Sequence, residues 1–338
     1  MGKLNPRAPS PKPGPDSIVS HALNSNMGEG WSDRVAVRVR CHAKLNLFLK
    51  VYGKRPDGFH DIVSIMQSID LADTLVLEES AVEGIEIVCT RPGVPLDSTN
   101  LAWKAAELMS AETGHPVNGL RITIEKDIPM MGGLAGGSAD GAGALVGLRR
   151  LWGVEIEDQA LFKMAAGLGS DVPFCLLGGT AVVRGRGEIL DPLPTGIADR
   201  GPDACFLLLI PPVQVETKGA YDLLDRSRER EARKWSSLRE EHTRIRVMWQ
   251  EAMIDGQFPV YFFNDFEQPI LTARPELAAL HSHLRNVAGH ALMSGSGSCV
   301  FAYFDRSVDA LSAASAYVPL AGEIPVIAFP ASRGIDLD

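Results

Sequence analysis

The sequence predicts an α+β protein with two domains. Strand and helix patterns intermix along the chain without the strict alternation of a doubly wound sheet. The 338 residues exceed what one compact domain usually needs. After Asp191 the prolines, glycines and polar residues have the composition of a linker, so we place the predicted domains at residues 35–195 and 204–330.

Residues 1–34 are predicted to form a flexible tail. Five prolines lie between Pro6 and Pro15, and polar residues and glycines follow them. Such a stretch buries too little apolar surface to offset the entropy lost on ordering it. It also lacks the apolar segment of a secretory signal.

The first strand patterns place a lysine and an asparagine together. Residues 35–40 alternate valine with alanine or arginine, which is typical of a half-buried strand. Within residues 45–51 every second position is leucine or valine, and the same parity sends Lys44 and Asn46 out of the opposite side of the strand. A Pro-Asp-Gly turn is predicted at residues 56–58.

Further helices and strands are predicted in both halves of the chain from periodicity and end signals. The predicted helices cover residues 99–113, 139–152, 159–166, 221–225, 228–253 and 276–285. The predicted strands cover residues 120–124, 180–183, 205–210, 291–293 and 299–304.

The composition argues against several classes of protein. Hydrophobic residues make up 45% and charged residues 22%, which is typical of globular chains. No apolar run approaches the roughly 20 residues of a membrane-spanning helix. The net charge of −9 disfavours nucleic-acid binding by bulk charge. Five cysteines without a CxxC pair argue against a disulfide framework or a zinc site and indicate a reducing cytoplasm.

A glycine-rich segment predicts a phosphate-binding loop. Six of the twelve residues from Gly132 to Gly143 are glycine, between a predicted strand and a predicted helix. Bare backbone N–H groups and the helix dipole would attract a phosphate. Ser138 could cap the helix or contact the phosphate or its metal. A flexible loop or tight helix packing explains an isolated glycine cluster equally well, but the strand before it and the helix after it favour the phosphate site.

Several other nucleotide and hydrolase motifs are absent from the sequence. No lysine follows the glycine-rich segment as the Walker A pattern requires, and there is no GxGxxG dinucleotide fingerprint. Neither HExxH nor GxSxG occurs. These absences disfavour a P-loop ATPase, a dehydrogenase and those two classes of hydrolase.

Two charged residues fit phosphoryl transfer to an alcohol. The Asp171 carboxylate could accept or orient a hydroxyl proton, while the Lys44 ammonium could stabilise charge on the transferring group. Taken singly, Asp171 could equally be an ordinary helix N-terminal residue and Lys44 a solvated strand lysine. A second glycine cluster at residues 294–298 could close the pocket or add N–H donors. The eight histidines form no metal-binding pattern, so the metal ligands stay unknown.

Five segments of the chain follow one another in a recognisable order. They are AKLNLFL at 43–49, RPDGFH at 55–60, the loop at 129–139, GSDVPF at 169–174 and SGSGSC at 294–299. The same order is seen in the GHMP kinase superfamily, which the chain resembles from about residue 35 to residue 304. The glycine loop marks only the superfamily. The first two signatures resemble the family that acts on a cytidine diphosphate-linked methylerythritol.

The resemblance implies a two-domain α+β kinase with its active site in the cleft between the domains. ATP, with Mg²⁺, would donate its γ-phosphate to the 2-hydroxyl of the methylerythritol, a step of non-mevalonate isoprenoid biosynthesis. We expect a small-molecule substrate, no nucleic acid, no membrane, a cytoplasmic location and a monomer or weak homodimer. The alternatives are a kinase acting on homoserine, mevalonate or a sugar, and a non-catalytic ligand-binding relative.

The resemblance also assigns catalytic and ATP-binding positions. Lys44 and Asp171 fall on the catalytic lysine and aspartate of the superfamily. The ATP loop would comprise Pro129, Met130, Met131, Gly132, Gly133, Leu134, Ala135, Gly136, Gly137, Ser138 and Ala139. Two positions depart from the usual pattern, because Ala139 replaces a second serine and Met131 stands where glycine is frequent.

Substrate-binding positions follow from the same resemblance. Asn46 and Thr217 fall near the erythritol and phosphate groups. Phe59 and Tyr221 fall on two aromatic residues that sandwich the cytosine, and His60 falls beside the base edge, where the backbone usually makes the contact. Phe59 stands where tyrosine is more common, so it keeps the stacking face and loses a hydroxyl.

Overall fold

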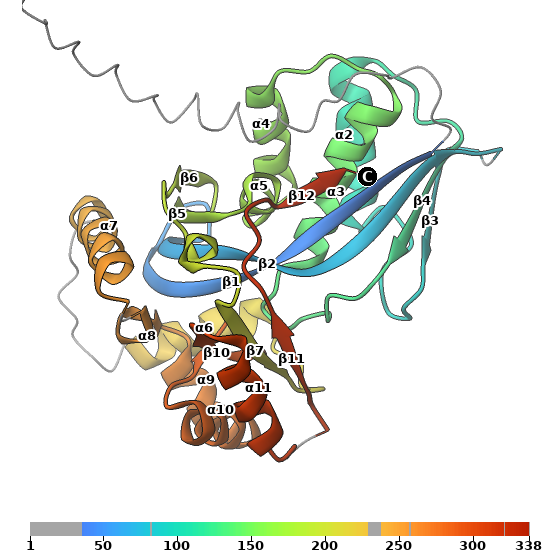
Figure 1. Cartoon of the computed structure of the whole chain (residues 1–338). Helices are drawn as coiled ribbons and strands as arrows, with labels where there is room; N and C mark the ends of the chain where they lie inside the picture. Colours follow the sequence, from blue (N-terminus) through green and yellow to red (C-terminus); the bar gives the residue numbers. More distant parts are fainter. Residues whose placement is uncertain (1–35, 82, 229–237, 257, 321, 338) are drawn as a thin grey trace, which may run out of the picture.

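The computed structural model describes residues 36–81, 83–228, 238–256, 258–320 and 322–337. The predicted tail at residues 1–34 lies outside these ranges. The described residues form the predicted α+β mixture, with two sheets and helices packed around them (Figure 1). None of the described helices combines the length and the apolar character that crossing a bilayer requires.

The first sheet has eight strands and is built around a long antiparallel hairpin. Its strands are β1 (Ala36–Lys54), β2 (His60–Glu79), β3 (Ile85–Cys89), β4 (Leu120–Glu125), β5 (Thr180–Gly185), β6 (Ile189–Pro192), β8 (Phe263–Asn264) and β12 (Ile335–Leu337). The order is β12–β1–β2–β4–β3, while β5 pairs with β2 and β6, and β8 pairs with β1. The predicted turn at residues 56–58 joins β1 to β2.

The hairpin differs from the sequence prediction in two respects. The two patterns at residues 35–40 and 45–51 belong to one continuous strand, β1. β2 has no counterpart among the predicted strands. Most of β2 is buried on both faces, so its sequence lacks the polar–apolar alternation that marks a half-buried strand.

Helices cover one face of this sheet. They are α2 (Leu101–Thr113), α3 (Gly136–Leu151), α4 (Asp158–Leu168) and α5 (Val172–Leu177). α3 packs directly on β1 and β2, and α2 packs on α3. α3 corresponds to the helix predicted at residues 139–152, but it begins three residues earlier, at Gly136.

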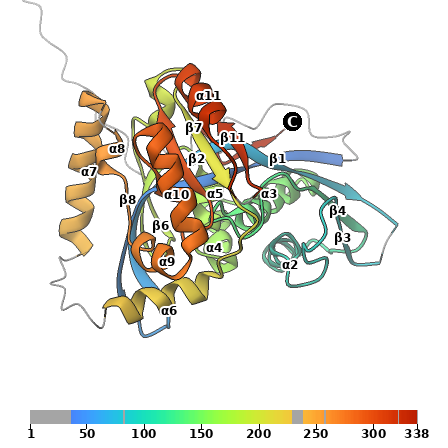
Figure 2. The same ribbon diagram turned by 90° about the horizontal axis from the view of Figure 1, so that it is seen from below.

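The second sheet has four strands in the order β11–β7–β10–β9. They are β7 (Cys205–Ile210), β9 (Leu292–Met293), β10 (Val300–Phe304) and β11 (Ile324–Ala328). The helices of this half are α6 (Thr217–Arg228), α7 (Leu238–Asp255), α8 (Phe258–Tyr261), α9 (Glu267–Ala273), α10 (Pro275–Ala288) and α11 (Ser307–Ala316). α10 and α11 pack on the sheet (Figure 2). The predicted helix at 228–253 is largely α7, and residues 229–237 are not among the described ones.

The strand β7 separates two hydrophobic cores. Phe206 and Leu208 belong to the core that also contains β1 and α3, whereas Leu207 and Leu209 belong to the core under α9 and α10. Because successive side chains of a strand point to opposite faces, this explains the unbroken apolar run. β8 and β12 return from the second half of the chain to pair with β1. The domain division at residues 35–195 and 204–330 stays a prediction.

Part of the glycine-rich segment serves helix packing. A Cβ atom on Gly143 would lie 2.1 Å from Cys41 Sγ, and one on Gly147 would lie 2.5 Å from Leu77 Cδ1. Without side chains at these positions, α3 approaches β1 and β2 closely. Tight packing therefore accounts for Gly143 and Gly147 in α3, whereas a Cβ atom on Gly137 would meet nothing within 4 Å. The loop before the helix needs a separate explanation.

We expect Gly143→Ala to destabilise the protein by about 1–3 kcal/mol, because the added methyl group would overlap a fully buried sulfur. Urea unfolding measures the change. Gly167→Ala in α4 is the matched control, since a Cβ atom there meets nothing within 4 Å; it should gain about 0.5–1 kcal/mol. Equal stability of the two variants would contradict the packing argument.

Candidate active site

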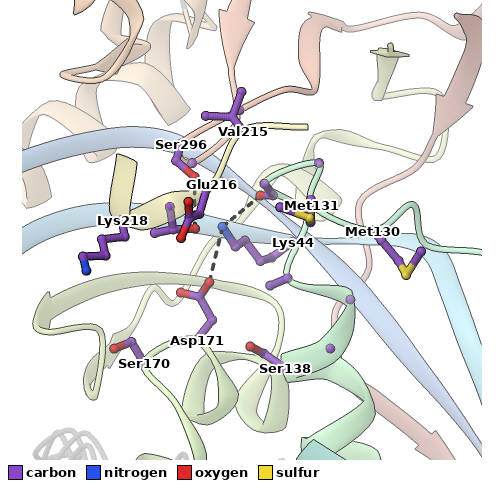
Figure 3. A pocket seen from close by; sticks show the side chains of 18 of the residues that line it. Lys44, Met130, Met131, Ser138, Ser170, Asp171, Val215, Glu216, Lys218 and Ser296 are labelled. Carbon is purple, nitrogen blue, oxygen red and sulfur yellow. Dashed lines mark hydrogen bonds and ion pairs between the residues drawn. The ribbon is translucent and has the colours of Figure 1, made fainter. Parts of the chain in front are cut away.

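A cavity of about 1000 Å³ lies between the two halves of the described chain. Its wall contains residues of β1, the β1–β2 turn, the glycine-rich loop, the segment before α5, the start of α6 and the second glycine cluster. Figure 3 shows side chains from β1, the glycine-rich loop, the segment before α5, the start of α6 and the second glycine cluster converging on one space. The predicted site residues line this cavity, except the loop residues Leu134 and Ala139, whose side chains are buried in the protein core.

Lys44 is the most constrained charge in the cavity wall. Its side chain is only 4% exposed, and its ammonium donates to Asn46 Oδ1 at 2.6 Å and to the carbonyl oxygen of Gly133 at 3.0 Å. Lys44 and Asn46 therefore share one side of β1, as the strand parity predicts. Asn46 Nδ2 in turn donates to Ser64 Oγ at 2.9 Å, which fixes the amide.

Asp171 approaches the same ammonium from another part of the chain. Its Oδ2 lies 3.7 Å from Lys44 Nζ, and its side chain is about one-third exposed, at 32%. The residue is the N-cap of α5, a short helix with a proline in its first turn, so the helix-terminal interpretation also holds. The two side chains point toward each other in Figure 3, with Glu216 beside them.

The glycine-rich loop adopts a backbone that most residues avoid. Met131 and Ala135 have φ of 56° and 59°, in the left-handed region, and Gly133 has φ of 74°. Each non-glycine residue there costs of order 1–3 kcal/mol, so the surroundings must hold the loop in place. The prediction that Ser138 caps α3 is wrong, because Ala135 is the N-cap and Ser138 lies in the first turn, on the cavity wall.

The second glycine cluster contacts the first loop. Ser294 Oγ donates to the Gly133 carbonyl oxygen at 3.0 Å and accepts from the Asn46 N–H at 3.3 Å. A Cβ atom on Gly133 would lie 2.1 Å from the Ser294 carbonyl oxygen, so only glycine permits this approach. Asn264 Nδ2 holds the cluster from behind by donating to the carbonyl oxygens of Met293 and Gly295 at 2.6 and 2.7 Å.

Aromatic side chains form another part of the cavity wall. Phe59 is 47% exposed, with the Arg186 guanidinium 4.9 Å from its ring centroid. The Tyr221 ring stacks on His60 at 4.7 Å, and His60 Nε2 lies 3.0 Å from Asp225 Oδ1. Burial raises the pKa of the Tyr221 hydroxyl, which therefore stays neutral.

The start of α6 also faces this cavity. Thr217 is the first residue of the helix, four residues before Tyr221, and both line the wall. Thr217 Oγ1 lies 3.4 Å from Ser296 Oγ of the second glycine cluster. The helix thus brings a hydroxyl group and an aromatic ring to one side of the cavity.

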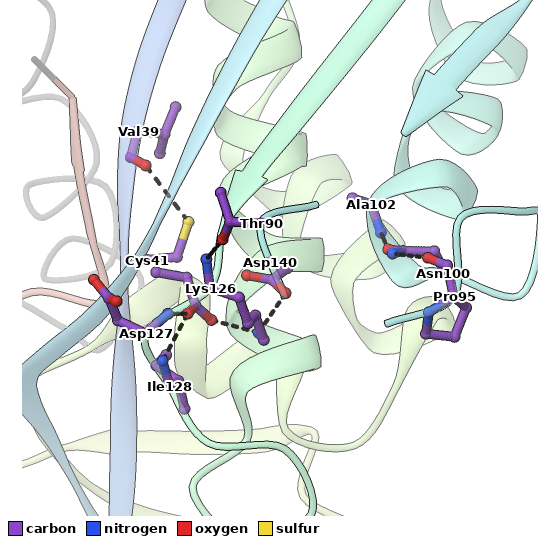
Figure 4. Close-up of polar contacts among 11 residues, drawn as sticks. Val39, Cys41, Thr90, Pro95, Asn100, Ala102, Lys126, Asp127, Ile128 and Asp140 are labelled. Atoms are coloured by element: carbon purple, nitrogen blue, oxygen red, sulfur yellow. Dashed lines mark hydrogen bonds and ion pairs between the residues drawn. The ribbon is translucent and has the colours of Figure 1, made fainter. Parts of the chain in front are cut away.

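A buried group of three charges lies at the two ends of the glycine-rich loop, and two of them, Lys126 and Asp140, also belong to the cavity wall. Lys126 Nζ donates to Asp140 Oδ2 at 2.6 Å and also to Asp73 Oδ2 (Figure 4). All three side chains are at most 5% exposed. Burial raises the pKa of Asp140 to about 7, and its Oδ1 has no hydrogen-bond partner.

Sequence reasoning missed several residues of this region. Ser294 belongs to a cluster that the sequence singled out, but the serine's contact with the first loop was not foreseen. Asn264, Lys126 and Glu216 stand in no recognisable pattern. Three apolar residues of the cavity wall, Val94, Pro95 and Leu101, were also missed, whereas Met130 belongs to the predicted loop.

Comparisons with known proteins agree with this arrangement. The family described as GHMP kinases N terminal domain matches residues 100–179. The 4-diphosphocytidyl-2-C-methyl-D-erythritol kinase of Gloeobacter violaceus is 41% identical over 268 residues, which cover 78% of this chain and 84% of that protein. The kinase of the same name from Carboxydothermus hydrogenoformans is 39% identical over 265 residues, 77% and 85% of the two chains.

Solved structures agree with the sequence relatives. A crystal structure of 4-(cytidine 5'-diphospho)-2C-methyl-D-erythritol kinase is 33% identical, has a TM-score of 0.68 and is matched over 86% of this chain and 98% of its own. Homoserine kinase from Cytophaga hutchinsonii has a TM-score of 0.68 at 18% identity, over 92% and 100% of the two chains, and shares the fold. The chain therefore belongs to the 4-diphosphocytidyl-2-C-methyl-D-erythritol kinase family of the GHMP kinases.

Proposed function

We propose that this protein transfers the γ-phosphate of ATP to the 2-hydroxyl of 4-diphosphocytidyl-2-C-methyl-D-erythritol. The observation that carries the proposal is the meeting of Lys44, Asp171 and the glycine-rich loop at one cavity wall. A kinase of this kind needs a group that orients the hydroxyl, a cation near the transferring phosphoryl and a cradle for the phosphates. Asp171, Lys44 and the glycine-rich loop would supply these three groups, in that order.

The backbone provides the phosphate cradle. The loop leads directly into α3, whose first N–H groups have no partner within the helix and whose dipole favours an anion. Ser138 adds a hydroxyl to the wall at this point. The apolar residues Val94, Pro95, Leu101 and Met130 lie at the same end of the cavity and suit the adenine base.

Lys44 and Asp171 would act on the reacting atoms. Two of the three N–H groups of the Lys44 ammonium donate to Asn46 Oδ1 and to the Gly133 carbonyl oxygen. The third N–H group is left for Asp171 or for a ligand in the cavity. Asp171 accepts or orients the substrate hydroxyl, and the fixed ammonium stabilises charge on the transferring phosphoryl group without moving.

Magnesium fits the oxygen donors of this wall. The carboxylates of Asp171 and Glu216 both line the cavity, and Mg²⁺ in kinases is usually held by one or two carboxylates together with substrate phosphates. The bound ion would neutralise phosphate charge. Asp171 and Glu216 are thus the two carboxylates of the described residues that we propose as ligands of the ion.

The aromatic end of the cavity would hold the cytosine. Phe59 comes from the β1–β2 turn and Tyr221 from α6, so two separate segments offer rings to one flat base. Asn46 accepts from the Lys44 ammonium and Thr217 begins the helix that carries Tyr221. Both residues line the cavity and would contact the erythritol and phosphate groups. A cytoplasmic monomer or weak homodimer remains our expectation for the whole protein.

We expect Asp171→Asn to lower kcat by about 10²–10⁴-fold, because the amide cannot take the hydroxyl proton. ADP release coupled to the diphosphocytidyl substrate measures it. Binding of ATP without Mg²⁺, measured by calorimetry, should change little, because the proposed contact of Asp171 with the metal does not then contribute. Asp309→Asn on α11, which breaks an exposed pair with Arg306, is the control and should keep full activity. Undiminished turnover by the Asp171 variant would remove this residue from the mechanism.

The aromatic site makes a separate prediction about substrate choice. Phe59→Ala should weaken binding of the diphosphocytidyl substrate by about 1–3 kcal/mol, the usual worth of base stacking, with an unchanged KM for ATP. Phe59→Tyr keeps the ring and should retain the affinity. Cytidine diphosphate should raise the melting temperature of the wild type, whereas homoserine, mevalonate and simple sugars should not. The opposite pattern of protection would favour another kinase of the superfamily.

A further inference from the structure

The three buried charges Asp73, Lys126 and Asp140 join both ends of the glycine-rich loop. Lys126 lies three residues before the loop, Asp140 lies in α3 after it, and Asp73 is in β2 beneath both. None of the three belongs to the Lys44–Asp171 pair. Burying an ammonium and two carboxylates is costly unless they pair. A buried group of this kind beside the loop therefore needs a functional or structural explanation.

Asp73 fixes the beginning of the loop. Its Oδ1 accepts from the backbone N–H groups of Asp127 at 2.7 Å and Ile128 at 2.8 Å, the two residues before Pro129. The side chain is fully buried, at 0% exposure, so water does not compete for these bonds. The backbone that enters the loop is thereby attached to β2.

Lys126 fixes the end of the loop. Its ammonium donates to Asp140 Oδ2 at 2.6 Å, one turn into α3. A Cβ atom on Gly136 would lie 3.0 Å from Lys126 Nζ, so the ammonium lies against the first residue of α3. The start of the helix, where phosphates would bind, therefore rests on the same charge group as the start of the loop.

The net charge of the Asp73–Lys126–Asp140 group indicates whether the group attracts a phosphate or holds the loop in position. One ammonium faces two carboxylates, so the group is neutral when Asp140 holds a proton and carries −1 when it does not. Either way it supplies no net positive charge to attract a phosphate. Its remaining effect is mechanical: it holds a loop whose Met131 and Ala135 lie in the costly left-handed region.

We propose that Asp140, through Lys126, is a positioning residue for the ATP site: the Asp73–Lys126–Asp140 group sets where the first N–H groups of α3 face the phosphates. The inference rests on the proposed function only in taking ATP as the ligand of the loop. Lys126 and Asp140 both border the cavity. Asp140 is only 3% exposed and its Oδ2 accepts from the Lys126 ammonium, so in this account it acts through the ammonium and the helix start.

Asp140→Ala tests the proposal with the least disturbance. Lys126 and Asp73 would remain as a one-to-one pair, so no buried charge is left without a partner. We expect the dissociation constant and the KM for ATP to rise by roughly 10-fold, since small displacements of binding groups cost up to about 10²-fold. The KM for the acceptor alcohol should not change. Asp140→Asn keeps an oxygen for Lys126 and should stay within about 3-fold of the wild type.

The control variant removes an ion pair from the other end of the same helix. Arg149 in the last turn of α3 pairs with Asp158 at 3.0 Å, and both side chains are mostly buried. Asp158→Ala should lower the melting temperature and leave ATP binding unchanged. If Asp140→Ala lowers the melting temperature equally and ATP binds as in the wild type, the group is merely structural and the proposal fails.

Calorimetry with ATP alone separates this inference from the proposed function. A wild type that binds ATP but does not phosphorylate the cytidyl substrate would overturn the function and leave the loop test valid. Should Asp140→Ala not fold, Asp140→Ser, which is too short to reach the ammonium, takes its place in the titration. Loss of ATP affinity in Asp140→Asn as severe as in the alanine variant would contradict the hydrogen bond to Lys126.

Discussion

The bond from the Lys44 ammonium to the Gly133 carbonyl oxygen is the contact on which the site depends. A lysine that is 4% exposed must have partners, because an unpaired buried charge is prohibitively costly. Its partners come from β1, the glycine-rich loop and the N-cap of α5. Satisfying this one charge therefore brings three segments together, and the same carbonyl oxygen accepts from Ser294 of the second glycine cluster.

The glycine-rich segment combines two physical tasks that look alike in sequence. Within α3, Gly143 and Gly147 let the helix approach β1 and β2. In the loop, Gly133 provides a positive φ and room for the Ser294 carbonyl group. Met131 adopts a positive φ of 56° without being glycine, which explains how the chain departs from the usual pattern and still forms the turn. The buried charges around Lys126 add rigidity where the backbone is least favourable.

The long strand β1 links Lys44, which contacts Asp171, to both hydrophobic cores. Leu45 and Leu47 lie in the core under α3, while Leu49 and Val51 lie in the core shared with β7 and α6. One rigid element thus carries Lys44 and Asn46 and extends to the turn that holds Phe59. This strand contacts the loop proposed to hold the phosphates and leads to the turn that carries Phe59, proposed to stack on the base. That arrangement suits the proposed binding of two nucleotide groups at once.

Sequence by itself determined the features that depend on local pattern. Strand parity places Lys44 and Asn46 on one side of β1, the Pro-Asp-Gly turn makes the hairpin, and the order of motifs identifies the family. Of the two roles considered for Ser138, that of the N-cap was wrong. The first residue of α3 is set by the left-handed backbone conformation of Ala135, which the amino-acid composition of the segment does not reveal. β2 escaped prediction because burial on both faces erases the alternation.

Only the tertiary structure decided which distant groups meet. Asp73 and Lys126 lie 53 positions apart, Gly133 and Ser294 lie 161 apart, and nothing in their local sequences marks them as partners. Whether such groups pair depends on which strands lie side by side and how closely loops approach, and these are properties of the packed chain. Local periodicity is set by neighbours within a few residues, so it fixes elements and leaves the assembly of the cavity to the fold as a whole.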